Sequence, residues 1–158
     1  MSGRPLDEID YAVLYALQED ARHNTNAAIS ERVSVSASTV GKRISRMEAE
    51  GMIRGYRSSV DYEKVGFPLQ VLFICTAGIA ERGSLTQEAL GLDGVVNVRE
   101  LIRGENNVHI QAVGASNEDI THVAHELDIM GYTVTDGILM RNEYDRPSVR
   151  FGTDTPSG

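Results

Sequence analysis

Apolar residues recur every three to four positions in the first part of the chain, which is the period of an amphipathic helix. The spacing predicts a helix that reaches about Asp20, with acidic side chains in its first turn, where the helix dipole favours negative charge. After a turn at 22–24, a shorter second helix is expected over 26–33. The apolar residues that define the first helix are Leu6, Ile9, Val13 and Leu17.

A third helix is predicted to start after Ser36, a favourable N-cap residue, and to reach Glu50, with Gly51 where a helix stops. Its apolar and polar residues fall on opposite sides of a helical wheel. The segment 52–60 is then rich in β-forming residues. Three helices, with a tight turn between the last two, and a following β segment predict a winged helix-turn-helix over 1–60. The apolar side of the third helix consists of Val40, Ile44 and Met47.

The pattern changes after a linker at 61–68, where short apolar runs typical of strands begin to alternate with stretches of helical spacing. The βαββαβ order predicts a ferredoxin-like sandwich over 69–146, an α+β fold whose helices cover one face of a sheet. Residues 147–158 are expected to form a flexible tail. The expected elements are a strand at 70–77, a helix at 84–90, strands at 95–103 and 108–113, a helix at 116–130 and a strand at 132–140.

The formal net charge of -8 is spread unevenly along the 158 residues. Residues 1–60 hold eight basic and eight acidic side chains, whereas 61–158 hold seven basic and fifteen acidic ones. Within the neutral part, 36–57 carries five basic side chains and two acidic ones. A basic patch on one module of an acidic protein is typical of a nucleic-acid footprint.

Composition also bears on the cellular setting of the protein. The longest apolar run, 71–75, is far shorter than the roughly 20 residues that cross a bilayer, and the N-terminus has no apolar signal core. We therefore expect a cytoplasmic protein, in which the single Cys75 is a small core residue. Only two of the 15 basic residues are lysines. An acidic surface poor in lysine resembles proteins of halophiles that accumulate salt, although a GC-rich genome accounts for the arginine preference equally well.

The polar side of the third helix supplies candidate DNA contacts. Ser38 and Thr39 are short enough to approach base edges, and Arg43 has the fork that pairs with O6 and N7 of guanine. Lys42 and Arg46 suit phosphates, although a basic helix face can also be merely solvated. The candidate DNA-binding residues are Arg22, Ser36, Ser38, Thr39, Lys42, Arg43, Arg46, Arg54 and Arg57.

Several stretches of the chain carry a resemblance to a known family. They include Leu-Asp-Glu-Ile-Asp at 6–10, Ser-Ala-Ser-Thr-Val at 36–40, Glu-Gly-Met-Ile-Arg-Gly-Tyr at 50–56 and Val-Asp-Tyr-Glu-Lys-Val-Gly at 60–66. Through them the chain resembles transcription regulators of the Lrp/AsnC (leucine-responsive, feast/famine) family, and its composition favours a haloarchaeal member. The resemblance implies that the second domain forms homodimers and higher homo-oligomers, and that an amino acid binds between subunits, as it does in many members.

The loop between the second and third predicted strands is the candidate effector site. The family's usual Gly-x-x-Asp pattern reads Gly104-Glu105-Asn106-Asn107 here, so the identity of a ligand does not transfer. Backbone amides around Gly104 suit a carboxylate, and Asn106 and Asn107 are expected to offer amide hydrogen bonds; a plain β-turn is the equal alternative. The candidate effector residues are Arg103, Gly104, Glu105, Asn106, Asn107 and Val108.

Two other functions stay open beside a sequence-specific regulator of transcription that binds double-stranded DNA. One is a DNA-organising protein that senses no effector. The other is an enzyme resembling siroheme decarboxylases, which share this two-domain architecture. The intact basic helix face argues against the enzyme, as does the presence of only His109 on a predicted strand. We therefore expect neither catalysis nor a cofactor or metal.

Overall fold

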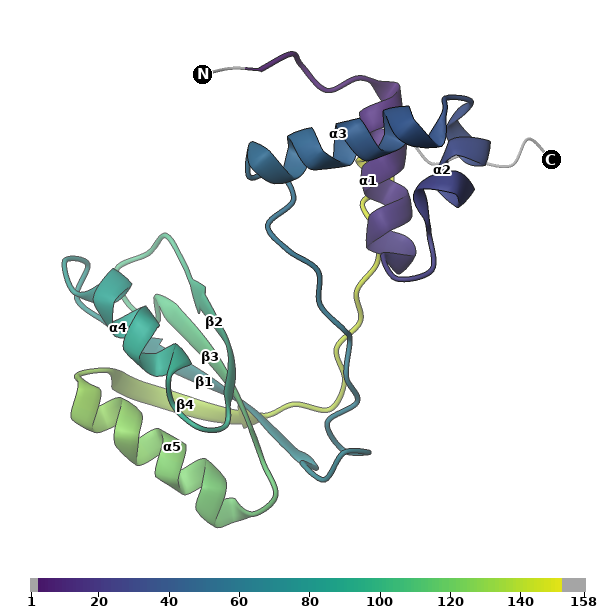
Figure 1. Ribbon diagram of the computed structural model, residues 1–158. Helices are drawn as coiled ribbons and strands as arrows, with labels where there is room; N and C mark the ends of the chain where they lie inside the picture. Colours follow the sequence, from purple (N-terminus) through teal and green to yellow (C-terminus); the bar gives the residue numbers. More distant parts are fainter. Residues whose placement is uncertain (1–2, 152–158) are drawn as a thin grey trace. The chain divides into compact units, whose positions relative to one another are not determined.

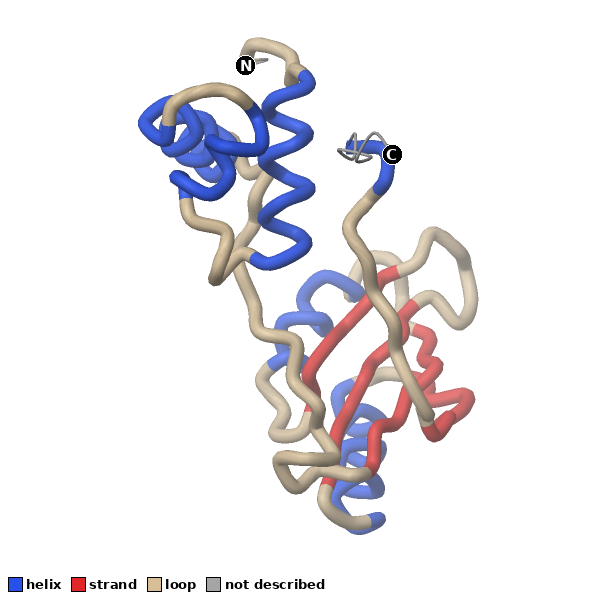
Figure 2. The backbone as a smooth tube through the Cα atoms, turned by 90° about the vertical axis from the view of Figure 1, so that its right-hand side faces the viewer, coloured by secondary structure: helices blue, strands red, loops and turns tan. Residues whose placement is uncertain are grey.

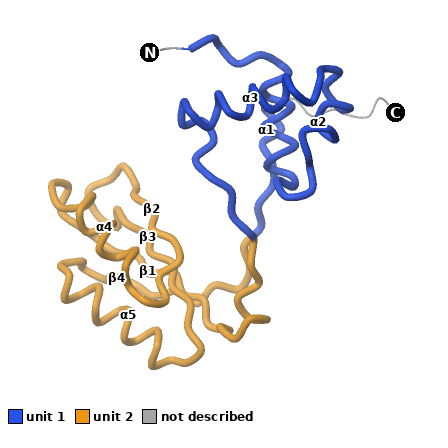
Figure 3. Tube along the Cα trace, in the orientation of Figure 1, with its two compact units in different colours: residues 1–58, 144–158 blue, residues 59–143 orange. Residues whose placement is uncertain are grey.

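The computed structural model describes residues 3–151, which divide into two compact units (Figures 1 and 3). Unit 1 contains the described parts of 1–58 and 144–158, so both ends of the chain contribute to it. Unit 2 is the continuous stretch 59–143. The expected order of a helical module followed by an α+β module is therefore observed. The C-terminal segment, however, belongs to the helical unit.

Unit 1 is built on three helices, α1 (Glu8–Asp20), α2 (Asn26–Val33) and α3 (Ala37–Ala49), which agree with the helices predicted from the sequence. α1 begins with a capping box between Asp7 and Asp10, and α3 begins at Ser36, whose side chain accepts a hydrogen bond from the amide of Thr39. The helices enclose a small apolar core. Its fully buried residues are Val13, Ala16, Ile29, Val40 and Met47.

The turn between α2 and α3 passes through Ser34 in the left-handed conformation, with φ of 57°. The amide of Ser34 donates to the carbonyl of Ser30, which closes α2 before α3 starts. Gly51, with φ of 74°, follows α3 in the same conformation, as predicted for a residue that ends a helix. The two left-handed residues therefore follow the ends of α2 and α3.

The segment 52–60 forms no strand in this structure, so the β segment expected there is not observed, although the three helices of the predicted module are. A β segment gains its stability from a hydrogen-bonded partner and from packing against it, and local composition supplies neither. Arg54 and Arg57 consequently lie on an exposed, extended connection and not on a strand.

Unit 2 has the predicted βαββαβ order, and its sheet has the strand order β2-β3-β1-β4 with antiparallel neighbours. The strands are drawn in red in Figure 2. Both helices pack on one face, in the arrangement of a ferredoxin-like sandwich (Figure 1). β2 ends at Glu100, three residues before the predicted end. The elements are β1 (Leu69–Thr76), α4 (Arg82–Leu90), β2 (Val95–Glu100), β3 (Val108–Gly114), α5 (Asn117–Met130) and β4 (Thr133–Leu139).

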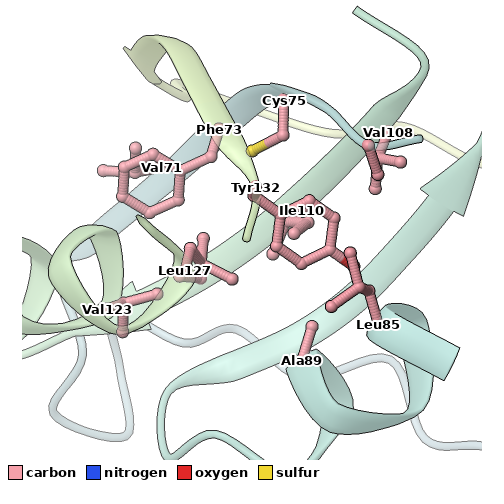
Figure 4. Packing of buried hydrophobic residues seen from close by; sticks show 12 residues of the cluster. Val71, Phe73, Cys75, Leu85, Ala89, Val108, Ile110, Val123, Leu127 and Tyr132 are labelled. Carbon is pink, nitrogen blue, oxygen red and sulfur yellow. The ribbon is translucent and has the colours of Figure 1, made fainter. Parts of the chain in front are cut away.

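The core of unit 2 lies between the sheet and its two helices (Figure 4). Alternate residues of β1 point into this layer and meet alternate residues of β3, because side chains alternate across a strand. Burial raises the pKa of the Cys75 thiol to about 12, so it stays protonated and serves as a small core residue. The largest buried side chains of this core include Phe73, Ile110, Leu127 and Tyr132.

The C-terminal segment does not behave as the predicted tail over its described residues. Residues 149–151 form a short 3-10 helix, η1 (Val149–Phe151), that packs on α1. The ring of Phe151 stacks on Tyr11 with a centroid distance of 5.8 Å, and the amide of Ser148 donates to Gln18 Oε1 at 3.3 Å. The domain boundary predicted at 146 therefore moves to 143, and the rest of the tail, 152–158, lies outside the described residues.

Candidate nucleic-acid interface

α3 presents a continuous exposed side, because residues three or four positions apart share one face of a helix. Ser38, Lys42 and Ser45 are exposed along it, and Ala49 continues the row. Ser36 and Thr39 lie beside the row at the start of the helix, where their hydroxyls are 2.9 Å apart. Their hydroxyls therefore serve first to cap and order the N-terminal turn.

Arg43 lies beside this row and turns toward the start of α1. Its Nη1 atom donates to both carboxylate oxygens of Asp7, at 2.7 and 2.8 Å, and to Asp10 Oδ1 at 3.0 Å. Arg4 approaches the same two carboxylates from the other side, at 2.9 and 3.2 Å. We call this group of Arg4, Asp7, Asp10, Arg43 and Arg46 the α1–α3 ion cluster.

The charges of the ion cluster stabilise one another. The hydrogen bond from Arg43 holds the pKa of the Asp7 carboxyl far below its ordinary value, and that same bond raises the pKa of Arg43. Because the pKa of Asp7 is lower in the folded state, its contribution to stability is present above the ordinary carboxyl pKa and is lost as pH falls. Asp10 has no exposed surface and Arg43 keeps only 19% of its side chain exposed, so solvent screens this pair weakly.

The predicted contact of Arg43 with guanine therefore has to compete with these ion pairs. A bidentate contact with guanine contributes about 1–3 kcal/mol of discrimination. Breaking a buried ion pair costs about 3–5 kcal/mol. Withdrawing Arg43 would leave Asp10 buried with one cation fewer, so the contacts with Asp7 and Asp10 are favoured.

Arg46 is also committed within the unit. Its Nε atom lies 3.3 Å from Glu50 Oε1, its Nη1 atom lies 3.8 Å from Asp10 Oδ2, and its Nη2 atom donates to the carbonyl of Arg4. Only 22% of its side chain is exposed. The predicted role of Arg46 as a phosphate contact thus has to compete with these partners.

The remaining basic candidates are exposed and lie on other segments. Arg22 is in the turn after α1, and Arg54 and Arg57 are on the connection after α3. The structure thus brings Ser38 and Lys42 together on one face and leaves these three arginines on neighbouring loops. Sequence reasoning overlooked Ser45, although its spacing of three from Lys42 was visible on the helical wheel.

The candidate effector loop is only partly accessible. Asn107 is fully buried, and its side chain pairs with the backbone of Ala77: Oδ1 accepts from the amide and Nδ2 donates to the carbonyl, both at 2.9 Å. Val108 is buried as well. The expectation that Asn107 offers its amide to a ligand is therefore wrong, since that amide closes the base of the loop.

Asn106 is also tied to neighbouring strands. Its φ is 50°, its amide donates to Thr76 Oγ1 at 2.8 Å, and its Oδ1 accepts from Thr135 Oγ1 at 2.9 Å. The exposed part of the loop is thus reduced to Arg103, Gly104 and Glu105. The left-handed conformation of Asn106 is typical of a residue in a turn.

Within residues 3–151, no helix is long and apolar enough to cross a membrane. The same residues contain no cluster of three histidine, cysteine, aspartate or glutamate side chains that could hold a metal ion.

Known proteins match both the sequence and the fold. The winged helix-turn-helix DNA-binding family matches residues 6–54. The leucine-responsive regulatory protein of Rhizobium meliloti is 30% identical over 112 residues, which cover 68% of this chain and 70% of that protein. The HTH-type transcriptional regulator AldR of Mycolicibacterium smegmatis is 37% identical over 83 residues, so the chain spans about half (48%) of that relative and the match covers 52% of the chain.

A solved structure extends the similarity over both units. The crystal structure of a transcriptional regulator from Neisseria meningitidis, a complex with L-Met, has a TM-score of 0.75 and 24% sequence identity. The superposition covers 91% of this chain and 95% of that chain. A helix-turn-helix followed by a ferredoxin-like domain places this chain in the class of two-domain DNA-binding regulators. The chain belongs to the Lrp/AsnC family of helix-turn-helix transcriptional regulators.

Proposed function

We propose that the chain regulates transcription by placing α3 in the major groove of double-stranded DNA. The observation that carries this proposal is the exposed polar row of α3, which starts at a capped helix N-terminus and carries Lys42. Lys42 is assigned to a phosphate, and Ser38 to base edges. Arg22, Arg54 and Arg57 add phosphate contacts from the adjoining loops, and Ser36 and Thr39 add hydroxyls at the start of α3.

Replacing Lys42 with alanine tests this proposal, and Lys64 provides a matched control because it is the other lysine and its side chain is 83% exposed. We expect Lys42→Ala to weaken binding to the promoter of the protein's own gene and to random DNA alike. The slope of log affinity against log salt should fall by about 1 for each bound α3. Fluorescence anisotropy across a salt series measures both effects.

Lys64→Ala should leave the salt slope unchanged. Equal slopes for wild type and Lys42→Ala would remove Lys42 from the interface. Absence of wild-type binding to either DNA at low salt would refute the proposed function. Strong binding without preference for the promoter would favour the DNA-organising protein.

We also propose that the sheet face not covered by α4 and α5 pairs with a second copy of the chain. Residues of this face lie side by side on three strands: Leu72 pairs with Gln111 and Ile138, and Ile74 pairs with His109. Ile138 is 46% exposed, so apolar surface lies open in the single chain. Burying such a patch against an identical one removes it from water, which favours association.

Leu72→Arg should convert the oligomer to smaller species, because a charge in the middle of an apolar interface cannot be solvated there. Sedimentation velocity measures the change in mass. Ile129→Arg is the control, since Ile129 is 64% exposed on α5, on the covered side of the sheet. A wild-type protein that sediments as a monomer, or an unchanged mass for Leu72→Arg, would contradict this assignment.

An amino-acid effector is proposed for the loop between β2 and β3. The similar Neisseria regulator was solved with L-Met, and Arg103 and Gly104 of this chain are exposed on that loop. The guanidinium of Arg103 suits the carboxylate of an amino acid. The assignment excludes Asn107 and Val108, which are buried.

We propose a salt-rich cytoplasm of haloarchaeal type as the setting, and no catalytic activity. The net charge of -8 and the ratio of thirteen arginines to two lysines support the setting. The names of the relatives, which are transcriptional regulators, support the absence of catalytic activity. At high salt, counterion release contributes little to DNA affinity, so base contacts and the linkage of several helix-turn-helix units contribute more.

A further inference from the structure

Ser45 is a polar residue of the exposed α3 row to which the proposed function assigns no contact. Ser45 is exposed and follows Lys42 by three positions and Ser38 by seven, so the three side chains point from one face of the helix. By contrast, Arg43 and Arg46 are bound by carboxylates of the same unit. The side chains left to meet DNA from α3 are therefore short hydroxyls and one lysine.

We propose that Ser45 is a specificity-determining residue that contacts base edges, and that Arg43 is a positioning residue that fixes the row of Ser38, Lys42 and Ser45. This inference rests on the DNA-binding function proposed above. It separates two roles on one helix. The exposed row contacts the bases, and the ion cluster fixes the orientation of α3.

The ion cluster is suited to alignment because of where its carboxylates lie. Asp7 is the N-cap of α1 and Asp10 is its third helical residue, and both are locked in a capping box. Arg43, midway along α3, is thereby tied to a rigid helix end by three hydrogen bonds. A rotation of α3 about its axis would break these bonds, so the cluster fixes which face of α3 is presented.

The charge pattern limits how far along α3 the row can contact DNA. Glu48 is exposed one turn after Ser45, and a carboxylate there repels phosphates. Contacts therefore start with the N-terminal residues that recognition helices place against base edges, here represented by Ser38, and end near Ser45. Because a hydroxyl both donates and accepts, Ser45 can pair with acceptors or donors of the major groove.

Selection of binding sites from a library of randomised DNA tests both roles, because a purely structural residue changes affinity without changing which bases are preferred. For Ser45→Ala we expect relaxed preference at one or more positions of the selected site, with the salt slope and melting temperature of wild type. For Arg43→Ala we expect weaker binding to all members of the library and the same preferred bases. Ser59→Ala, an exposed serine outside α3, is the control and should select the wild-type site.

Either of two results would overturn the inference. One is a wild-type preference kept by Ser45→Ala, and the other is a guanine preference lost in Arg43→Ala. If Arg43→Ala does not fold, Arg43→Lys replaces it, since a lysine keeps a charge beside Asp7 and Asp10 but lacks the fork that reads guanine. A wild-type protein that selects no site at all would refute the proposed function itself, which is a different outcome.

Discussion

Asp10→Ala is expected to lower the free energy of unfolding of unit 1 by about 3–5 kcal/mol, the usual cost of breaking a buried ion pair. Asp10 has no exposed surface, and it accepts hydrogen bonds from Arg4, Arg43 and the amide of Asp7. Its removal leaves those donors without a partner and also opens the capping box of α1. Urea unfolding followed by circular dichroism, with calorimetry to separate the two units, measures the loss.

Asp20→Ala is the matched control for this experiment. Asp20 is the last residue of the same helix and pairs with His23 at 2.8 Å, but 46% of its side chain is exposed. Exposed pairs contribute little to stability, so we expect unfolding close to that of wild type. If Asp10→Ala also unfolds like wild type, the ion cluster does not stabilise the unit.

Asn107→Ala is expected to destabilise unit 2 by roughly 3 kcal/mol, because it strands the amide and the carbonyl of Ala77 in the protein interior, at about 1–3 kcal/mol for each group. The side chain of Asn107 is their hydrogen-bond partner in the structure, at 2.9 Å on both sides. Asn142→Ala, at an exposed position, should leave the unfolding of unit 2 unchanged.

Asn107→Asp sharpens the test because it keeps the shape of the side chain. A carboxylate still accepts from the amide of Ala77 but faces the carbonyls of Ala77 and Gly104, to which Nδ2 of Asn107 donates. We expect this variant to be unstable at neutral pH and to regain stability as acid protonates the carboxyl, which then donates again. Wild-type stability of both variants would show that the amide of Asn107 is dispensable.

The parts of the fold that were predictable from the sequence depend on neighbours close along the chain. The N-cap of α3 needs only Ser36 and Thr39, three positions apart, and the strands of unit 2 follow from short apolar runs between stretches of helical spacing. The β segment expected at 52–60, which forms no strand, shows the limit of this reasoning. β-forming composition indicates a strand only when another segment offers a ladder, and composition does not identify that segment.

The candidate site was predictable as a surface, but the role of its arginines was not. A helical wheel correctly puts Arg43 away from the apolar core. The wheel carries no information about Asp7 and Asp10, which lie 36 and 33 positions away in the sequence and meet Arg43 only after folding. The structural role of Asn107 was not predictable for the same reason, because its partner Ala77 is 30 positions away. Contacts between distant residues therefore decide which polar groups remain free.

The packing of 144–151 on α1 makes unit 2 an insertion within unit 1 in the order of the chain. Two covalent connections, at 58–59 and 143–144, then join the units. A fragment ending at 58 would expose the surface of α1 that meets Phe151 and Ser148. The helix-turn-helix is therefore best produced in isolation by replacing 59–143 with a short loop, which keeps both ends of the chain in one piece.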